Sequence, residues 1–324
     1  MDRRYAELLL ASVIFARSTS LLFAKIGLEH MEPLGLLSAR SCVAFVVLAL
    51  IFARRLRKTT WRDVGHGLLL GGSILAVMIA ETFALRVTTA STTSFLENTA
   101  IVIVPLFEAV LCRKLPERRV LVTALVTLTG VGLLTLRGGA GGFGLGEGLA
   151  LLAACLYAAA IILTGRLSRT GDPFLLGVWQ VGGMALFSTI GAGATGTLRL
   201  PPDATSWGVV LMLALVCSCF GFTLQPVAQR YTGTDRAAQL CAINPLSVAT
   251  LSTLFLGERL GAAGLCGAAL ILTGILMQSL WPAAKAGQTV PLRQRIAAGL
   301  DRVGSLSGAL LRPQKRPVRH GSSM

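Results

Sequence analysis

Six ionisable residues lie inside stretches of sequence that are otherwise almost entirely apolar, namely Arg17, Lys25, Arg40, Glu81, Glu97 and Glu108. A charged side chain near the centre of a lipid bilayer costs roughly 2.5–3.5 kcal/mol. Such groups must therefore pair with one another, reach the membrane surface or border water. A guanidinium can hold a carboxylate or another anionic group, whereas a carboxylate can meet an amine or carry a proton. The set is a candidate binding site for a molecule that carries such groups.

Depth along a helix separates these residues into two groups. At a rise of 1.5 Å per residue, Arg17 falls near the middle of its apolar stretch, whereas Lys25 and Glu108 fall near opposite boundaries, within reach of the interface or of a loop charge. The candidates for a buried, water-accessible site are therefore Arg17, Arg40, Glu81 and Glu97. Glu81 and Glu97 are also candidates for coupling transport to a proton. The alternative is an Arg–Glu pair that only fixes helix packing.

Polar and aromatic residues of the second half of the chain complement these charges. Their amide, hydroxyl and ring groups suit a polar organic molecule better than a bare ion, although interhelical hydrogen bonding is an equally good interpretation of any one of them. The predicted substrate contacts in this half are Tyr157, Trp179, Gln180, Gln225 and Asn244. Pro105 and Pro245 each remove a backbone donor, and we expect both to break the helices that contain them.

The composition places these residues in a membrane protein. The chain has 324 residues, of which 53% are hydrophobic and 14% are charged, and its mean hydropathy is +0.70. A soluble domain carries roughly a quarter charged residues. Soluble, disordered, collagen-like and disulfide-rich secreted classes are therefore excluded.

Apolar runs of about 20 residues, the length that crosses the hydrocarbon of a bilayer, occur ten times. We therefore predict an all-α integral membrane protein with ten transmembrane helices. The predicted spans are 5–28, 33–53, 65–85, 90–112, 119–136, 147–165, 173–194, 207–229, 237–256 and 261–281.

The distribution of Lys and Arg predicts the orientation of these spans. Cytoplasmic loops of membrane proteins are enriched in both residues. If both termini are cytoplasmic, most Lys and Arg residues fall in the cytoplasmic loops and in the C-terminal tail. The loops on the non-cytoplasmic side then hold only Arg86, Arg137, Arg199 and Arg259. We predict a multi-pass protein of the cell inner (plasma) membrane. The net charge of +15 then reflects topology, so no nucleic-acid partner is expected.

Two halves of the chain resemble each other at a shift of 140 to 144 residues. This shift aligns Glu7 with Glu147, Pro33 with Pro173, and Pro105 with Pro245. Each half holds five predicted spans, and an odd number inverts the second copy relative to the first, which is typical of secondary transporters. The predicted segments are a first repeat at 1–138, a Gly-rich linker at 139–146, a second repeat at 147–281 and a basic cytoplasmic tail at 282–324.

Several motifs resemble the drug/metabolite transporter superfamily, EamA type. They are AKIGLEHMEP at 24–33, LLSAR ending at Arg40, TTAS at 88–91, CLYAAAIILTGRL around Tyr157, GVWQ ending at Gln180, LQPVAQRYT at 224–232, INPLSVATLSTLFLGERL at 243–260, and GAALILTGIL at 267–276. The resemblance covers residues 5–281 and implies a ten-helix inner-membrane carrier for small metabolites. Arg17-Ser18 stands where the family usually has Trp-Gly, and Asn244-Pro245 stands where it usually has Glu-Pro, so no relative's substrate is carried over.

Together these patterns predict a secondary transporter that moves a small polar metabolite, amino acid-like or drug-like, out of the cell by alternating access. The expected partners are this substrate, the lipid bilayer and protons as coupling ion, and the protein would be a monomer or a homodimer. No cofactor or metal is expected, because the three histidines are too scattered for a metal site. The alternatives are a multispan membrane enzyme acting on a lipid-linked substrate, and a channel.

Overall fold

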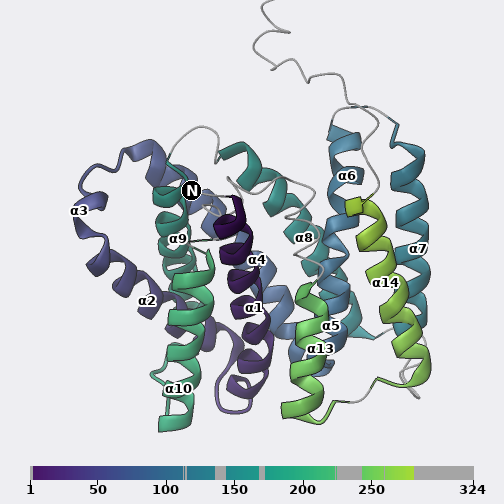
Figure 1. Cartoon of the computed structure of the whole chain (residues 1–324). Helices are drawn as coiled ribbons and strands as arrows, with labels where there is room; N and C mark the ends of the chain where they lie inside the picture. The colour runs from purple at the N-terminus through teal and green to yellow at the C-terminus, as the bar shows by residue number, and fades with distance from the viewer. Residues whose placement is uncertain are drawn as a thin grey trace, which may run out of the picture. The chain divides into compact units, whose positions relative to one another are not determined.

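The computed structural model describes most of the chain up to residue 280 (Figure 1). The described residues are 3–111, 113, 115–135, 144–167, 172–222, 224, 243–258 and 260–280. The predicted contact Gln225 and the predicted tail at 282–324 lie outside them. Within the described residues the chain is helical and contains no strand. The elements are α1 Arg3–Gly27, α2 Pro33–Ile51, α3 Ala53–Leu56, α4 Trp61–Val87, α5 Ala90–Asn98, α6 Ala100–Leu111, α7 Arg118–Thr135, α8 Leu145–Leu167, α9 Pro173–Ala194, α10 Ala204–Met212, the π-helix η2 Leu213–Phe222, α13 Ile243–Leu256 and α14 Ala262–Leu280.

Seven helical stretches of the described chain are long and apolar enough to cross a membrane. They are Pro33–Ile51, Trp61–Val87, Ala90–Leu111, Arg118–Thr135, Leu145–Leu167, Phe174–Ala194 and Ala204–Gly221. Two shorter apolar helices cover Asn244–Leu256 and Ala262–Met277. The first predicted span corresponds to α1, which has 25 residues but is not among the seven. The structure thus agrees with an all-helical membrane protein, while the count of ten spans stays a prediction.

Polar side chains fix where several of these helices begin. Thr60 and Asp63 form a reciprocal capping box at the start of α4, where the side chain of each residue accepts from the backbone N–H of the other. Asp172 caps α9 by accepting from the Phe174 N–H at 2.9 Å, and Pro173 follows as its first residue. These capping residues therefore fix the N-termini of α4 and α9.

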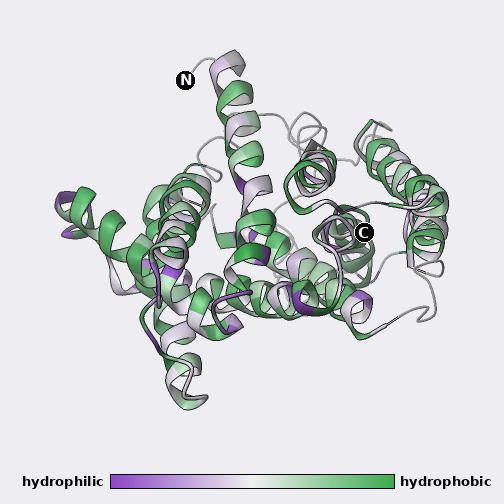
Figure 2. Ribbon diagram, turned by 90° about the horizontal axis from the view of Figure 1, so that it is seen from below, coloured by the Kyte–Doolittle hydropathy of each residue, from purple (hydrophilic) through white to green (hydrophobic). Residues whose placement is uncertain are grey.

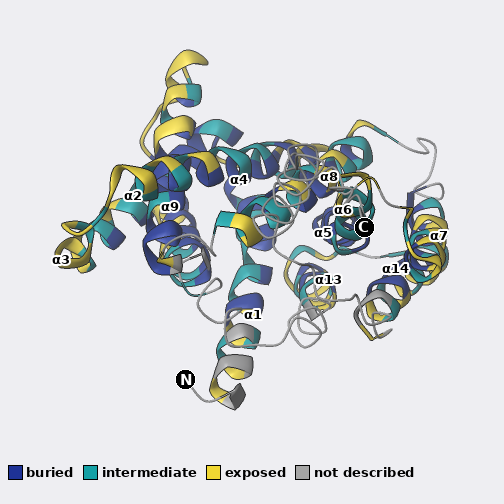
Figure 3. Cartoon of the chain, turned by 90° about the horizontal axis from the view of Figure 1, so that it is seen from above, coloured by how far each residue is buried: buried dark blue, intermediate teal, exposed yellow. Residues whose placement is uncertain are grey.

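The bundle is organised around α4, which packs against both α8 and α9. At one edge α7 and α14 lie side by side, and at the other α2 packs on α9 (Figure 1). Figure 2 shows that hydrophobic residues make up much of most of the long helices. Figure 3 shows that the faces turned away from the bundle are the exposed ones, and they include Leu50, Leu128 and Leu254. Exposed apolar faces of this kind fit a lipid environment.

Close packing of α4 on α9 depends on a glycine. A Cβ placed on Gly71 would lie 2.4 Å from the Gln180 carbonyl oxygen and 2.8 Å from the Gly183 Cα. Both are backbone atoms, which cannot move aside as a flexible side chain can. Gly71 therefore sets the distance between the two helices.

We expect Gly71→Ala to lower the free energy of unfolding by about 1–3 kcal/mol, the usual cost of overpacking. The matched control is Gly65→Ala on the same helix, because nothing lies within 4 Å of a Cβ at Gly65. Thermal unfolding of both variants in detergent would check this. Equal melting temperatures for the two variants would contradict the packing argument.

Candidate functional site

Four charged residues from four helices face the same region of the bundle. Arg17 lies on α1, Arg40 on α2, Glu81 on α4 and Glu97 on α5. Arg17 interacts electrostatically with both carboxylates, and Arg40 interacts with Glu81 and with Arg17. Two positive and two negative groups therefore balance one another inside the bundle, as burial in a membrane requires.

Arg40 is fixed in place by two serines from neighbouring helices. Its side chain is almost entirely buried, at 2% exposed. The guanidinium donates from Nη1 to Ser20 Oγ at 3.3 Å, and from Nη2 and Nε to Ser218 Oγ at 3.2 and 3.4 Å. Within the described residues it forms no ion pair at salt-bridge distance. Arg40 thus supplies a positive charge that neutral hydroxyls orient but do not neutralise.

Arg17 connects the two halves of the chain at the same level. Its Nη1 donates to the Tyr157 hydroxyl at 3.3 Å, and its Cζ lies 5.9 Å from the centroid of that ring. Gly221 of η2 leaves room for it, since a Cβ there would lie 3.0 Å from Arg17 Cγ. The hydroxyl and ring of α8 therefore hold a guanidinium of α1 in a cation–π and hydrogen-bonded contact.

Glu97 occupies the last turn of α5, beside a break in the helix. The helix stops at Asn98 and resumes at Ala100. The Asn98 side chain donates to the Ser94 carbonyl at 2.7 Å, and Thr99 Oγ1 donates to the Leu96 carbonyl at 2.6 Å. Backbone acceptors at the break are therefore satisfied by local side chains. Glu97 itself is 8% exposed and forms no hydrogen bond or ion pair with any described residue.

The interruption of the fourth predicted span does not fall at its proline. The interruption of the fourth predicted span is at Thr99, ahead of Pro105, which lies inside α6. Pro245 is the third residue of α13 as described, from Ile243, and the preceding part of its predicted span, 237–242, lies outside the described residues. Its neighbour Asn244 accepts from Ser18 Oγ at 2.8 Å. This bond joins α13 to α1 one residue from Arg17.

One predicted contact, Trp179, lies away from this cluster, and a second, Gln180, is its neighbour on α9. The Trp179 indole N–H donates to Thr59 Oγ1 at 3.2 Å, and its ring packs on Phe45 with centroids 5.9 Å apart. Gly67 of α4 accommodates the Trp179 backbone. Gln180 is buried at 4% exposure, and its carbonyl lies at the α4–α9 crossing described above. The structure therefore places Trp179 in helix packing near the start of α4, and the backbone of Gln180 at the crossing of α4 and α9.

The two boundary charges behave as their depth suggests. Lys25 donates to the carbonyls of Leu85 and Thr88 at 2.5 and 2.7 Å, at the end of α4, where a cation is favoured by the helix dipole. Glu108 is exposed. Neither residue contributes to the central cluster.

Sequence reasoning missed the π-helix and the serine at position 20. Residues Leu213–Phe222 wind with wider turns than an α-helix, and π-helical segments are frequent at functional sites. This winding presents Ser218 to Arg40 and Gly221 to Arg17. Cys217 donates to the Ala16 carbonyl at 3.3 Å, which anchors the same segment to α1. No short-range sequence pattern predicts such a segment.

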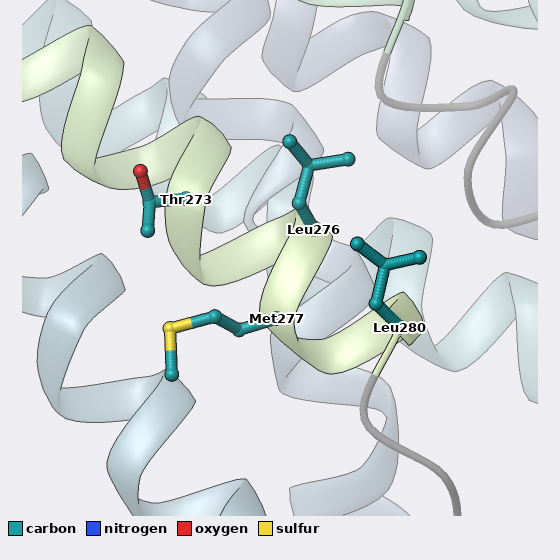
Figure 4. Close-up of a pocket in the computed structure, with 4 residues that line it drawn as sticks. All are labelled: Thr273, Leu276, Met277 and Leu280. Carbon is teal, nitrogen blue, oxygen red and sulfur yellow. The ribbon is translucent and has the colours of Figure 1, made fainter.

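Two hollows lie away from the charged cluster. One, of about 360 Å³, is formed on α14 by Thr273, Leu276, Met277 and Leu280 (Figure 4). The other, of about 340 Å³, is lined by residues that include His30, Glu32 and Arg199. Beside it, the backbone N–H of Ser206 donates to Asp203 and lowers the pKa of that carboxyl. Neither hollow contains a predicted site residue, and no cluster of metal-binding side chains occurs within the described residues.

Comparison with known proteins identifies the family. The model of the EamA-like transporter family matches residues 4–136 and 144–280, so the chain belongs to this family of membrane transporters. Two proteins of Archaeoglobus fulgidus, each named an uncharacterized transporter, are similar. One is 27% identical over 280 residues, covering 86% of this chain and 87% of the relative. The other is 26% identical over 285 residues, covering 84% and 96%.

A further relative and a solved structure extend this comparison. The uncharacterized transporter YcbK of Bacillus subtilis is 26% identical over 138 residues, covering 40% of this chain and 44% of the relative. One solved crystal structure has the same fold, with a TM-score of 0.62 at 18% identity, covering 86% of this chain and 98% of that chain. The sequence resemblance to the EamA type is thus confirmed.

We expect Ser218→Ala to lower the free energy of unfolding by about 1.5–3 kcal/mol, because two N–H groups of a buried guanidinium lose their acceptor. Ser73→Ala is the control, since Ser73 is partly exposed and its hydroxyl donates to the Leu69 carbonyl of its own helix. Melting temperatures in detergent would check this. The same melting temperature for both variants would show that Ser218 does not hold Arg40.

Proposed function

We propose that this transporter is a secondary carrier that exports a small polar metabolite across the cytoplasmic membrane by alternating access. The central observation is the cluster of Arg17, Arg40, Glu81 and Glu97, of which Arg40 and Glu97 are buried and Arg17 and Glu81 are partly buried. Both termini are proposed to be cytoplasmic, as the Lys and Arg distribution predicts. Charged groups held inside an apolar bundle fit a site for a polar cargo better than a purely structural core.

Alternating access needs two similar halves that can exchange roles, and the helix contacts support such an arrangement. If the two halves are exchanged, the contact between α4 and α8 corresponds to the contact between η2 and α1. The contact of α4 with α9 corresponds in the same way to that of η2 with α2. The contact of α1 with α13 corresponds to that of α8 with α5 and α6. This pattern favours an internal two-fold relation between repeats at 1–138 and 147–281.

The four charges suggest the kind of substrate. Arg17 and Arg40 would hold a carboxylate or a similar anionic group, and Tyr157 would orient it through its hydroxyl. Glu97 lacks a hydrogen-bond partner in the described chain and would meet an amine or carry the coupling proton. Glu81 interacts with both arginines and would balance their charge. An amino acid-like molecule carries both groups that this set requires.

Replacing Glu97 tests whether its charge serves coupling or packing. We expect Glu97→Gln to keep substrate exchange between equal pools while losing most of the flux driven by a pH gradient, because an amide cannot carry the proton. Glu108→Gln is the control on the same span, since Glu108 is exposed. Reconstituted proteoliposomes would provide both measurements. Loss of folding in Glu97→Gln, with unchanged pH-driven flux in Glu108→Gln, would favour the structural pair instead.

Replacing Arg17 tests the anion site. We expect Arg17→Gln to raise the KM for substrates with a carboxylate by about tenfold or more, the equivalent of one charge-assisted hydrogen bond. The KM for amines that lack a carboxylate would stay unchanged. Counterflow screened across amino acids, nucleosides and cationic drugs would supply the substrates. Flux that does not saturate and shows no counterflow would contradict a carrier and favour a channel.

A further inference from the structure

A carboxylate from the second half of the chain caps the helix that carries Glu97. Glu258, between α13 and α14, accepts from the backbone N–H groups of Ala90 and Ser91 at 2.8 and 3.1 Å. It also accepts from Ser91 Oγ at 2.8 Å, and that hydroxyl lies 2.7 Å from Ser252 Oγ of α13. Acceptors at a helix N-terminus satisfy backbone donors and complement the helix dipole.

Other bonds hold the same corner of the chain. Thr88, between α4 and α5, donates from its hydroxyl to Glu147 of α8 at 2.8 Å, and its carbonyl accepts from Lys25. The Lys25 ammonium also interacts electrostatically with Glu258. The turn between α4 and α5 is therefore tied to the second half of the chain through two carboxylates, Glu147 and Glu258.

The length of α5 makes this cap significant for the central site. The helix has nine residues, Ala90–Asn98, and is separated from α6 by the break at Thr99. Glu258 binds its first turn, and Glu97 lies in its last turn. Because a short helix moves as a rigid unit, a shift at Ala90 carries Glu97 with it.

The matching glutamate of the first half makes a different contact. Glu117 precedes α7 as Glu258 precedes α14, in LPERR and LGERL respectively. Its carboxylate forms an ion pair with Arg119 of its own half, with 2.7 Å between Oε2 and Nε. Of these two glutamates, Glu258 is the one that crosses between the halves in this structure.

We propose that Glu258 is a positioning residue whose carboxylate, by capping α5, places Glu97 in the central site and closes the bundle at that end. The contact is broken and re-formed in each transport cycle. This inference rests on the proposed alternating-access function, because only a carrier must open the end at which Glu258 binds. The hydrogen bonds from Glu258 to Ala90 and Ser91 have to break when α13 and α14 move away from α5.

The test measures access to the central site from each side of the membrane. A cysteine is placed at Ser94, which is buried on α5 one turn before Glu97, in a variant whose seven native cysteines are replaced by alanine. A membrane-impermeant thiol reagent is applied to either face of proteoliposomes. We expect Glu258→Gln to raise the labelling rate about tenfold from the face at which α5 begins. The neutral amide forms weaker hydrogen bonds to Ala90 and Ser91 than the carboxylate does. The rate from the opposite face would not rise.

Glu32→Gln is the matched control, because Glu32 pairs with Arg86 of the same half, at 3.0 Å, on the exposed surface. Ser91→Ala removes one of the three bonds and should give a smaller increase from the same face, which keeps the test available if Glu258→Gln does not fold. Counterflow by Glu258→Gln should also show an altered pH dependence, since Glu97 is displaced. Global loosening, by contrast, would raise labelling from both faces.

Unchanged labelling in Glu258→Gln and Ser91→Ala, or an equal rise from both faces, would overturn the inference. The labelling needs no substrate, so it is independent of transport. A native chain that fails to show counterflow with any substrate would overturn the proposed function, whereas unchanged labelling in a chain that transports would overturn the role of Glu258 alone.

Discussion

Compensation of buried charge is the constraint on which this structure depends. Arg40 is almost completely enclosed, and the groups that touch its guanidinium are neutral hydroxyls. An uncompensated guanidinium inside a bilayer is unfavourable by several kcal/mol. The carboxylate of Glu81, which lies on α4, supplies the opposite charge to Arg40, and Glu97 on α5 interacts with Arg17. Helices α1, α2, α4 and α5 must therefore stay together for any of these groups to remain buried.

Irregular helices place these groups. An uninterrupted α-helix repeats its side-chain directions every few residues, which limits the number of polar groups it can turn toward one point. The break at Thr99 and the π-helix Leu213–Phe222 relax this limit beside Glu97 and Ser218. The backbone acceptors that the break exposes are satisfied by Asn98 and Thr99. Irregular backbone inside a membrane is tolerated when its polar groups are hydrogen-bonded in this way.

Hydrogen bonds join the two halves at several levels of the bundle, and one of them, from Trp179 to Thr59, lies at the end where α4 begins. Arg17 meets Tyr157 and Ser18 meets Asn244 near the middle of the bundle. Glu147 and Glu258 meet the turn between α4 and α5 at one end. The family assignment and the polar centre both indicate a membrane transporter.

The sequence by itself determined the membrane class, the family and the identity of the buried charges. Composition and span length are local properties, and an ionisable residue inside an apolar run is visible without knowing what surrounds it. The same reasoning placed Lys25 and Glu108 at the boundaries. It could not place Trp179, because an aromatic residue near a helix start fits helix packing as well as a binding site.

Only the tertiary structure decided which groups meet. Ser20 and Ser218 contact Arg40, and Glu258 reaches Ala90, because helix rotation and crossing bring together residues far apart in the chain. The position of the fourth-span break was also decided there, at Thr99 rather than at Pro105. A proline marks a site where one backbone hydrogen bond is lost, but the packing of neighbouring helices determines where the helix is interrupted.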